Sequence, residues 1–246
     1  MNKENLIYGI NALQHMLENS PHKLLEIYVA TNRQDSRAQK LVDQAQQQNI
    51  SIQKIDIKKL DQWLLDCNHQ GVAAKITATT LLQESDLCKL CQNNPKALFL
   101  ILDGVQDPHN FGACLRTADA AGVTAVIIPR DNSVSVTSVV RKVASGAADS
   151  VNIVQVGNLA RAMRELQQHG VWIAGTAADG EQSLYAIDFT GPTAIVLGAE
   201  GSGIRQLTRQ HCDYLVHIPM LGSVESLNVS VATAVCLYEI VRQRIT

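Results

Sequence analysis

The chain of 246 residues has no hydrophobic segment long enough to cross a membrane. No stretch of about 18 apolar residues runs without a charge, and no basic start is followed by an apolar run of signal-peptide length. We therefore expect a soluble, cytoplasmic protein that has no membrane partner. Hydrophobic residues still make up 46% of the chain, which is enough to build one large core or two small ones.

An excess of charge of one sign is also missing. The net charge is −2, so the composition gives no support for a nucleic-acid partner, although a local basic patch is compatible with it. The cysteines are too sparse for a secreted disulfide scaffold, and we expect reduced thiols. They are Cys67, Cys88, Cys91, Cys114, Cys212 and Cys236.

Two common nucleotide-binding motifs are absent from the sequence. There is no G-x-x-x-x-G-K-[ST] phosphate loop, and the glycine cluster at residues 198–203 reads G-x-x-G-x-G instead of the dinucleotide order G-x-G-x-x-G. This order argues against a nicotinamide-dependent oxidoreductase. By itself, the cluster is equally compatible with an ordinary turn.

Other isolated candidates for chemistry are weak. Cys88 and Cys91 form a Cys-x-x-Cys pair, but no second pair follows, so we expect no metal site. Cys114 is expected to be a buried small hydrophobic residue of a helix, not a nucleophile. His109 is a less favoured candidate for a general base than the residues considered below.

Hydrophobic periodicity predicts a small α/β domain over residues 1–77. The expected helices lie near residues 9–19, 35–48 and 60–65, and the expected strands near 25–29, 50–55 and 72–77. Residues 78–95 have no β-branched core run and end in Asn93-Asn94-Pro95, which is typical of a turn. We expect a linker there.

The same alternation on a larger scale predicts a second α/β domain over residues 96–246. Its strands are near-continuous apolar runs, which favour a mostly parallel sheet covered on both faces, with ligands at the carboxyl ends of the strands. Strands are expected at 97–102, 123–128, 151–156, 171–176, 194–198 and 214–218, and helices at 111–121, 158–169, 204–210 and about 227–244.

Three segments of this second domain carry distinctive motifs. They are DPHNFGACLRTA at residues 107–118, IVLGAEG at 195–201, and the stretch 218–232, which contains Ser226-Leu227-Asn228. In content, order and separation they resemble the motifs of the TrmH (SpoU) branch of the SPOUT methyltransferases, and no motif residue departs from that pattern. Residues 1–77, with Ile7-Tyr8-Gly9 near their start, resemble the N-terminal RNA-binding domain of the same branch.

The resemblance implies an S-adenosylmethionine-dependent enzyme that methylates the ribose 2′-hydroxyl of a specific guanosine in 23S rRNA. It also implies a deep trefoil knot, in which the chain after about Gly198 passes through an earlier loop, and a homodimer formed through the catalytic domain. The cofactor positions that it implies are Gly198, Ile218 and Leu227. The first two end expected neighbouring strands, where backbone groups can bind a neutral adenine.

The family assigns the role of base to the arginine of the first motif, here Arg116. A guanidinium has a pKa above about 12 and is effectively never deprotonated in proteins. We therefore expect Arg116 to clamp an RNA phosphate and stabilise the developing alkoxide, with the proton passing to phosphate or water. The resemblance makes Asn110, Glu200, Ser226 and Asn228 the positioning groups around it.

Simpler interpretations of these residues stay open at this point. Asn110 can act as the N-cap of helix 111–121, and Arg116 can form a surface ion pair with Asp107 or Asp119. Either Ser226 or Asn228 can cap the last helix. A catalytically inactive RNA-binding module with the same fold is the alternative function. In the first domain, Lys23, Arg33 and Arg37 are candidates for phosphate contacts.

Overall fold

The chain forms two compact units in the computed structural model, which describes residues 6–31, 36–64, 67–77, 81–131 and 133–245. The first unit comprises residues 1–80 together with 136–150, and the second comprises 81–135 together with 151–246. The grouping of 136–150 with the first unit has no counterpart in the sequence prediction. The predicted domain limits remain a prediction. Arg33, one of the candidates for phosphate contacts, lies outside the described residues.

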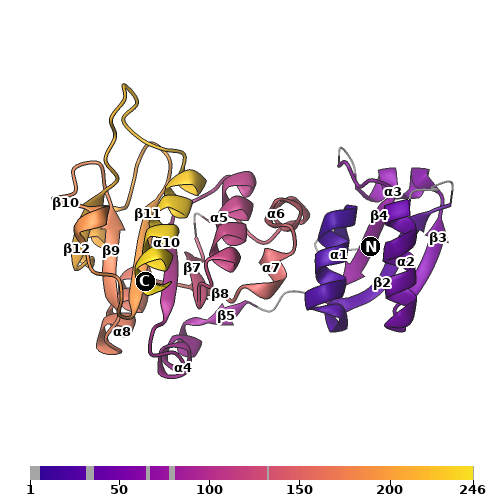
Figure 1. Ribbon diagram of the computed structural model, residues 1–246, viewed down its shortest axis with the longest axis horizontal. Helices are drawn as coiled ribbons and strands as arrows, with labels where there is room; N and C mark the ends of the chain where they lie inside the picture. The colour runs from indigo at the N-terminus through magenta and orange to yellow at the C-terminus, as the bar shows by residue number, and fades with distance from the viewer. Residues whose placement is uncertain (1–5, 32–35, 65–66, 78–80, 132, 246) are drawn as a thin grey trace. The chain divides into compact units, whose positions relative to one another are not determined.

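The first unit is built on a four-stranded sheet with the order β1-β4-β2-β3 (Figure 1). Strand β4 pairs antiparallel with β1 and β2, whereas β2 and β3 are parallel. Ile7, Ile27 and Ala74 face a core that α1 and α2 complete, and Tyr8 and Tyr28 face a second one that α3 completes. The elements are β1 (Leu6–Tyr8), α1 (Ile10–Asn19), η2 (Pro21–Lys23), β2 (Leu24–Ala30), α2 (Ser36–Gln47), β3 (Ser51–Ile55), α3 (Ile57–Trp63), β4 (Val72–Ile76), α6 (Ser138–Ala144) and α7 (Ala147–Ser150).

The second unit contains an eight-stranded sheet with the order β10-β12-β9-β11-β6-β7-β8-β5 (Figure 1). Every pairing between these strands is parallel, which confirms the predicted sheet type. The strands are β5 (Leu82–Gln83), β6 (Leu98–Asp103), β7 (Ala125–Pro129), β8 (Ile153–Val156), β9 (Trp172–Thr176), β10 (Gln182–Ser183), β11 (Thr193–Gly198) and β12 (Tyr214–His217).

Helices cover both faces of this sheet, as expected for strands that are apolar on both sides. Phe99 and Ile101 of β6 belong to a core that includes side chains of α4 and α8. Leu100 and Leu102 alternate with them and are buried on the other face, where α10 packs against α5 and β11. The helices are η3 (Glu84–Asp86), α4 (Leu87–Gln92), α5 (Pro108–Ala120), α8 (Leu159–Gln168), η4 (Leu184–Ala186), α9 (Gln206–Gln210) and α10 (Val229–Ile245).

The segment expected as a linker differs from that expectation. Part of residues 78–95 forms β5, η3 and α4, and β5 pairs with β8. Leu87 is fully buried, and Leu82, Leu90 and Cys91 pack against the same core. The apolar positions of this segment recur at helical spacing over only six residues, which is too short a pattern to distinguish a helix from a polar connection.

The central strands of the second unit end at one edge of the sheet. Strands β12, β9, β11 and β6 are consecutive in the sheet and run parallel, so the loops that follow them are brought together. The expectation that the strands before Gly198 and Ile218 are neighbours is wrong, because β9 lies between β11 and β12. The passage of the chain after Gly198 through an earlier loop stays a prediction. Within the described residues, no helix is both long and apolar enough to span a membrane.

Candidate active site

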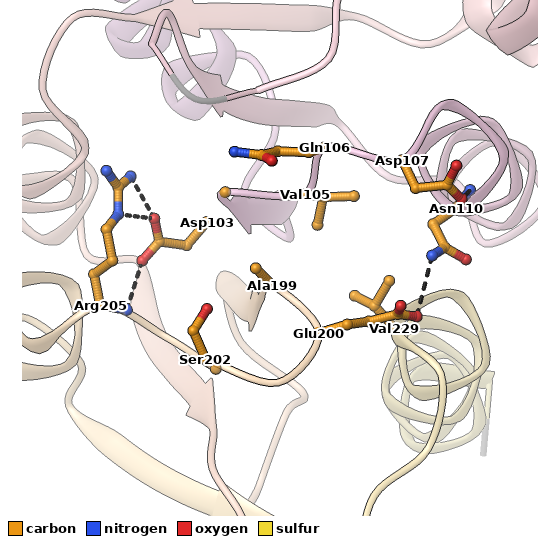
Figure 2. A pocket seen from close by; sticks show the side chains of 12 residues that line it. Asp103, Val105, Gln106, Asp107, Asn110, Ala199, Glu200, Ser202, Arg205 and Val229 are labelled. Carbon is orange, nitrogen blue, oxygen red and sulfur yellow. Dashed lines mark hydrogen bonds and ion pairs between the residues drawn. The ribbon is translucent and has the colours of Figure 1, made fainter.

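Two adjoining cavities lie where the central strands of the second unit end. The larger cavity, of about 750 Å³, is lined by residues that follow β9, β11 and β12 and by the start of α10. The smaller cavity, of about 410 Å³, is lined by the loop after β6, the start of α5 and the loop after β11 (Figure 2). Their common wall consists of Ala199, Glu200, Ser202, Gly203 and Val229.

The larger cavity gathers the three predicted cofactor positions. Gly198, Ile218 and Leu227 all line it, although they come from three separate parts of the sequence. Its apolar wall suits a flat, uncharged ring. Three carboxylates and one guanidinium also line it; Arg209 pairs with Asp179, so the negative charge left over comes from Glu200 and Glu225. The apolar residues include Leu197, Ile204, Val216, Ile218, Met220 and Leu227, and the carboxylates are Asp179, Glu200 and Glu225.

Gly198 occupies a position that has no room for a side chain. A Cβ atom there would lie 2.0 Å from the carbonyl carbon of Gly203 and 2.2 Å from the nitrogen of Ile204. The loop returns so tightly because the Gly203 N–H donates to the Ala199 carbonyl at 2.9 Å and Gly201 has a φ of +79°. The glycine cluster is therefore a turn, and the same turn forms the wall between the two cavities.

One residue from each of the three motif segments meets in a hydrogen-bonded cluster, here called the amide–carboxylate cluster. It consists of Asn110, Glu200 and Asn228. The Asn110 amide donates to Glu200 Oε1 at 3.1 Å, and the Asn228 amide donates to Asn110 Oδ1 at 2.9 Å and to Glu200 Oε1 at 2.6 Å. Figure 2 shows Asn110 and Glu200 facing one another at one end of the smaller cavity.

The helix caps beside this cluster correct one interpretation of the sequence. Helix α5 begins at Pro108, not after Asn110, and its N-cap is Asp107, whose carboxylate accepts the Asn110 backbone N–H at 2.9 Å. Pro108 favours that start because its fixed φ suits the first helical position. The Asn110 side chain is thereby free for the cluster. Asn228 does act as a cap, since its Oδ1 accepts the Ser230 N–H at 2.9 Å.

Arg116 and Ser226 do not belong to the amide–carboxylate cluster. Arg116 is exposed on α5, lines neither cavity, and forms no hydrogen bond or ion pair with any residue that the structure describes. The alternative of a surface ion pair with Asp107 or Asp119 is therefore not found among the described residues; Asp107 serves as the helix cap instead. Ser226 is exposed and lines the larger cavity without a hydrogen bond from the described part of the chain.

Cys114 is buried beneath this site. Its Sγ lies 3.3 Å from Thr233 Oγ1, which joins α5 to α10. Burial raises the pKa of the Cys114 thiol to about 11, so the thiol is protonated near neutral pH and is unsuited to nucleophilic attack. The prediction of a buried structural cysteine is confirmed.

Asp103 and Arg205 are two site residues that the sequence interpretation missed. The Asp103 side chain is fully buried at the end of β6. It accepts the Arg205 backbone N–H at 3.0 Å and the guanidinium Nε at 2.5 Å, and Arg205 Nη2 also contacts it. The available signal was a single carboxylate that ends the otherwise apolar strand LFLILD.

Comparisons with known family models cover both units of the chain. The model of the SpoU rRNA Methylase family matches residues 97–238. The model described as RNA 2′-O ribose methyltransferase substrate binding matches residues 6–82. The first match alone spans more than half of the chain and includes the three motif segments.

Curated relatives match the chain over almost its whole length. It is 53% identical over 241 residues to the 23S rRNA (guanosine-2′-O-)-methyltransferase RlmB of Haemophilus ducreyi, covering 98% of each chain. It is 52% identical over 244 residues to the protein of the same name from Shewanella oneidensis, covering 99% of each chain.

Solved structures share the fold of the whole chain. A crystal structure of an RNA 2′-O ribose methyltransferase matches with a TM-score of 0.79 and 26% identity, covering 98% of this chain and 89% of that one. The SpoU methyltransferase AviRb from Streptomyces viridochromogenes, solved in complex with the cofactor AdoMet, matches with a TM-score of 0.77 and 24% identity, covering 98% and 90%. From its motifs, its fold and its relatives, the chain belongs to the SpoU rRNA methylase family.

Proposed function

We propose that this protein transfers a methyl group from S-adenosylmethionine to the ribose 2′-hydroxyl of a specific guanosine in 23S rRNA, in the cytoplasm. The observation that carries the proposal is the amide–carboxylate cluster, which joins the three motif segments at the wall between two cavities. A transfer between two substrates requires two sites that meet at the reacting atoms. The names of the two relatives reported above give the 2′-oxygen of a guanosine in 23S rRNA as their methylation site, which supports the same substrate here.

The larger cavity fits the cofactor by the chemistry of its walls. Adenine is flat and uncharged, and the apolar residues around Gly198, Ile218 and Leu227 can enclose it while backbone groups at strand ends bind its polar edge. The carboxylates of Glu200 and Glu225 suit the positive charges of the cofactor. When bound, S-adenosylmethionine supplies a methyl group on a positively charged sulfonium.

The amide–carboxylate cluster orients the acceptor hydroxyl. Its hydrogen bonds fix the Asn110 amide, because Nδ2 donates to Glu200 and Oδ1 accepts from Asn228. Glu200 Oε1 receives two hydrogen bonds, whereas Oε2 receives none from the described residues. Oε2 is therefore the acceptor for a ribose hydroxyl, and Ser226 at the edge of the larger cavity is a further polar contact.

Arg116 binds the RNA backbone next to the reacting ribose. Its guanidinium is exposed and not held by another described side chain, so it can donate two parallel hydrogen bonds to a phosphate and the 2′-oxygen. These bonds strengthen as negative charge develops on that oxygen. Arg116 acts in this way as an electrostatic clamp and not as a base.

The first unit selects the RNA. Its match to a family model of substrate binding supports this role, and residues such as Lys23 and Arg37 are candidates for phosphate contacts. Deletion of residues 1–77 is expected to leave cofactor affinity intact and to abolish methylation of rRNA. Full activity of the shortened protein on its natural target would contradict the assignment.

The protein forms a homodimer through the second unit. Val231, Tyr238 and Ile245 recur at seven-residue intervals on α10, and their side chains are 48%, 51% and 80% exposed. Such a stripe on a helix is costly to leave in water and suits a symmetric contact with a second copy. Light scattering should give a dimer at micromolar concentration, and Tyr238→Asp should shift it to monomer. A monomeric wild type would contradict the proposal.

Calorimetry and a methyl-transfer assay together test the proposed function. We expect S-adenosylmethionine to bind, NAD not to bind, and radioactive methyl groups to appear on the ribose of a guanosine in unmodified 23S rRNA. Binding of rRNA without cofactor binding or transfer would instead indicate a catalytically inactive RNA-binding module. Transfer to a base atom would contradict the assigned acceptor.

A further inference from the structure

The smaller cavity contains a guanidinium that is held in place from one side only. Nε and Nη2 of Arg205 both contact Oδ1 of Asp103, whose side chain is fully buried, and the Arg205 backbone N–H donates to the other carboxylate oxygen. Nη1 has no hydrogen bond with any described residue, and the Arg205 side chain is 50% exposed. The plane of the guanidinium is therefore fixed while one edge remains available to a ligand.

The cavity extends from this guanidinium to the amide–carboxylate cluster. Figure 2 shows Arg205 on one side of the cavity and Asn110 with Glu200 on the opposite side, with Ala199 and Ser202 between them. If the ribose lies at the cluster, the base attached to it extends toward Arg205. The cavity volume of about 410 Å³ is within the range of small-ligand sites.

The charge of the cavity distinguishes between a base and a phosphate as the group that meets Arg205. Three carboxylates line the cavity, those of Asp103, Asp107 and Glu200, against the single guanidinium of Arg205. Asp103 already compensates the charge of Arg205. A phosphate would add a negative charge to a wall that is already acidic, whereas a neutral base would not.

We propose that Arg205 recognises the acceptor guanine in the smaller cavity through its O6 and N7 atoms; this inference rests on the proposed function. An arginine fork donates two hydrogen bonds to this pair of acceptors, which is the commonest base-specific contact of proteins in the major groove of DNA. Nη1 and the outer N–H of Nη2 supply those donors. Adenine has an amino group in place of O6, so this hydrogen-bond donor would face an N–H donor of Arg205 and no bond could form. Arg205 is thus a specificity-determining residue, and Asp103 positions it.

The test compares acceptor bases in a fragment of 23S rRNA under single-turnover conditions. The wild type is expected to methylate the guanosine acceptor roughly 10- to 100-fold faster than an adenosine at the same position. Removal of N7, as in 7-deazaguanosine, should slow the wild type about tenfold because one charge-assisted hydrogen bond is lost. In Arg205→Ala, guanosine should react at a rate close to that of adenosine and of 7-deazaguanosine. Arg205→Lys should restore little of the preference, because an ammonium group is not a planar fork.

Arg161→Ala is the matched control. Arg161 is also an exposed arginine in a two-point pair, with Glu84, but it lines neither cavity. The Arg161→Ala variant should keep the wild-type preference for guanosine over adenosine and 7-deazaguanosine. Calorimetry should show unchanged S-adenosylmethionine affinity in both alanine variants, since Arg205 is absent from the wall of the larger cavity.

Two outcomes would overturn the inference and leave the proposed function standing. One is an equal slowing of all three acceptors by Arg205→Ala, which would assign Arg205 to the RNA backbone. The other is an unchanged rate of the wild type on 7-deazaguanosine, a result that does not depend on whether any variant folds. A wild type that transfers no methyl group to any acceptor would overturn the proposed function itself.

Discussion

Glu200 Oε1 and the side-chain nitrogen of Asn228 lie 2.6 Å apart, although the two residues are 28 positions apart in the chain. The Oδ1 atom of the same Asn228 accepts the N–H of Ser230 at the start of α10. One side chain thus fixes the beginning of the last helix and orients the carboxylate in the wall between the two cavities. Stability and catalysis should therefore respond differently to different replacements of Asn228.

Replacing Asn228 separates these two roles. Asn228→Ala removes the cap and should lower the free energy of unfolding by about 1 kcal/mol. Asn228→Asp keeps an oxygen for the cap but places a second carboxylate beside Glu200, so stability should be largely retained while methyl transfer falls sharply. Urea unfolding and single-turnover methylation measure the two effects. Near-normal transfer by the aspartate variant would contradict the orienting role.

Gly198→Ala should damage the larger cavity. The added Cβ would meet the backbone of Gly203 and Ile204, which cannot move without opening the turn. We expect a loss of about 1–3 kcal/mol of stability and weaker binding of S-adenosylmethionine. Gly157→Ala is the control, because a Cβ there has nothing within 4 Å and φ is not in the left-handed region. Thermal unfolding and calorimetry check both variants, and equal cofactor affinities would argue against this account.

The sequence predicted those parts of the fold that depend on local pattern. The apolar runs that became β6 and β11 are buried along almost their whole length, so both their type and their approximate bounds could be predicted. The start of α5 was predicted three residues late, because Asn110 was favoured as a cap over Asp107-Pro108. Strand β5 has only two residues, which is too short for an alternating pattern to appear.

Only the parts of the candidate site that belong to the three motif segments could be predicted from the sequence. Gly198, Ile218 and Leu227 line one cavity, and Asn110, Glu200 and Asn228 form one cluster. Arg116, around which the resemblance placed the polar groups, lines neither cavity. The contact of Asp103 with Arg205 joins residues 102 positions apart, and no periodicity connects them. Only the folded chain brings that pair together. The roles of all these residues in binding and catalysis remain predictions.

Buried thiols should make the protein less stable at alkaline pH. Burial raises the pKa of Cys114 to about 11 and that of Cys236 to about 12, from a value of 9.0 in an accessible thiol. Above pH 9 the unfolded chain releases these protons first, so its free energy falls relative to the folded state. The contribution of each thiol to stability is complete below pH 9 and is lost as the pH rises toward the raised pKa, about 11 for Cys114 and about 12 for Cys236. The loss is at most about 1.4 kcal/mol per thiol for each pH unit.

Urea unfolding of wild type and Cys236→Ala at several values between pH 8 and pH 11 measures this loss. The variant is expected to start from a lower stability, because a buried side chain becomes smaller, but to show a shallower decline with pH. The slope is therefore the informative quantity. Equal slopes for the two proteins would mean that Cys236 does not contribute to the alkaline loss.

Arg116 gives the sharpest test of the proposed chemistry, because no contact with the described residues gives it a structural role. It is exposed on α5 and has no hydrogen bond or ion pair with a described residue, so Arg116→Ala should change the free energy of unfolding by no more than about 0.5 kcal/mol. If Arg116 clamps a phosphate and the developing alkoxide, the same change should lower the single-turnover rate by roughly two to three orders of magnitude.

The controls for Arg116 use both substrates and a conservative replacement. Affinity for S-adenosylmethionine should be unchanged in Arg116→Ala, because Arg116 does not line the larger cavity. Arg116→Lys should recover little activity, since a point charge cannot hold two oxygens in one plane. A rate near that of the wild type in the alanine variant would refute the clamp. Recovery of that rate by lysine would reduce the role of Arg116 to that of a positive charge beside the RNA.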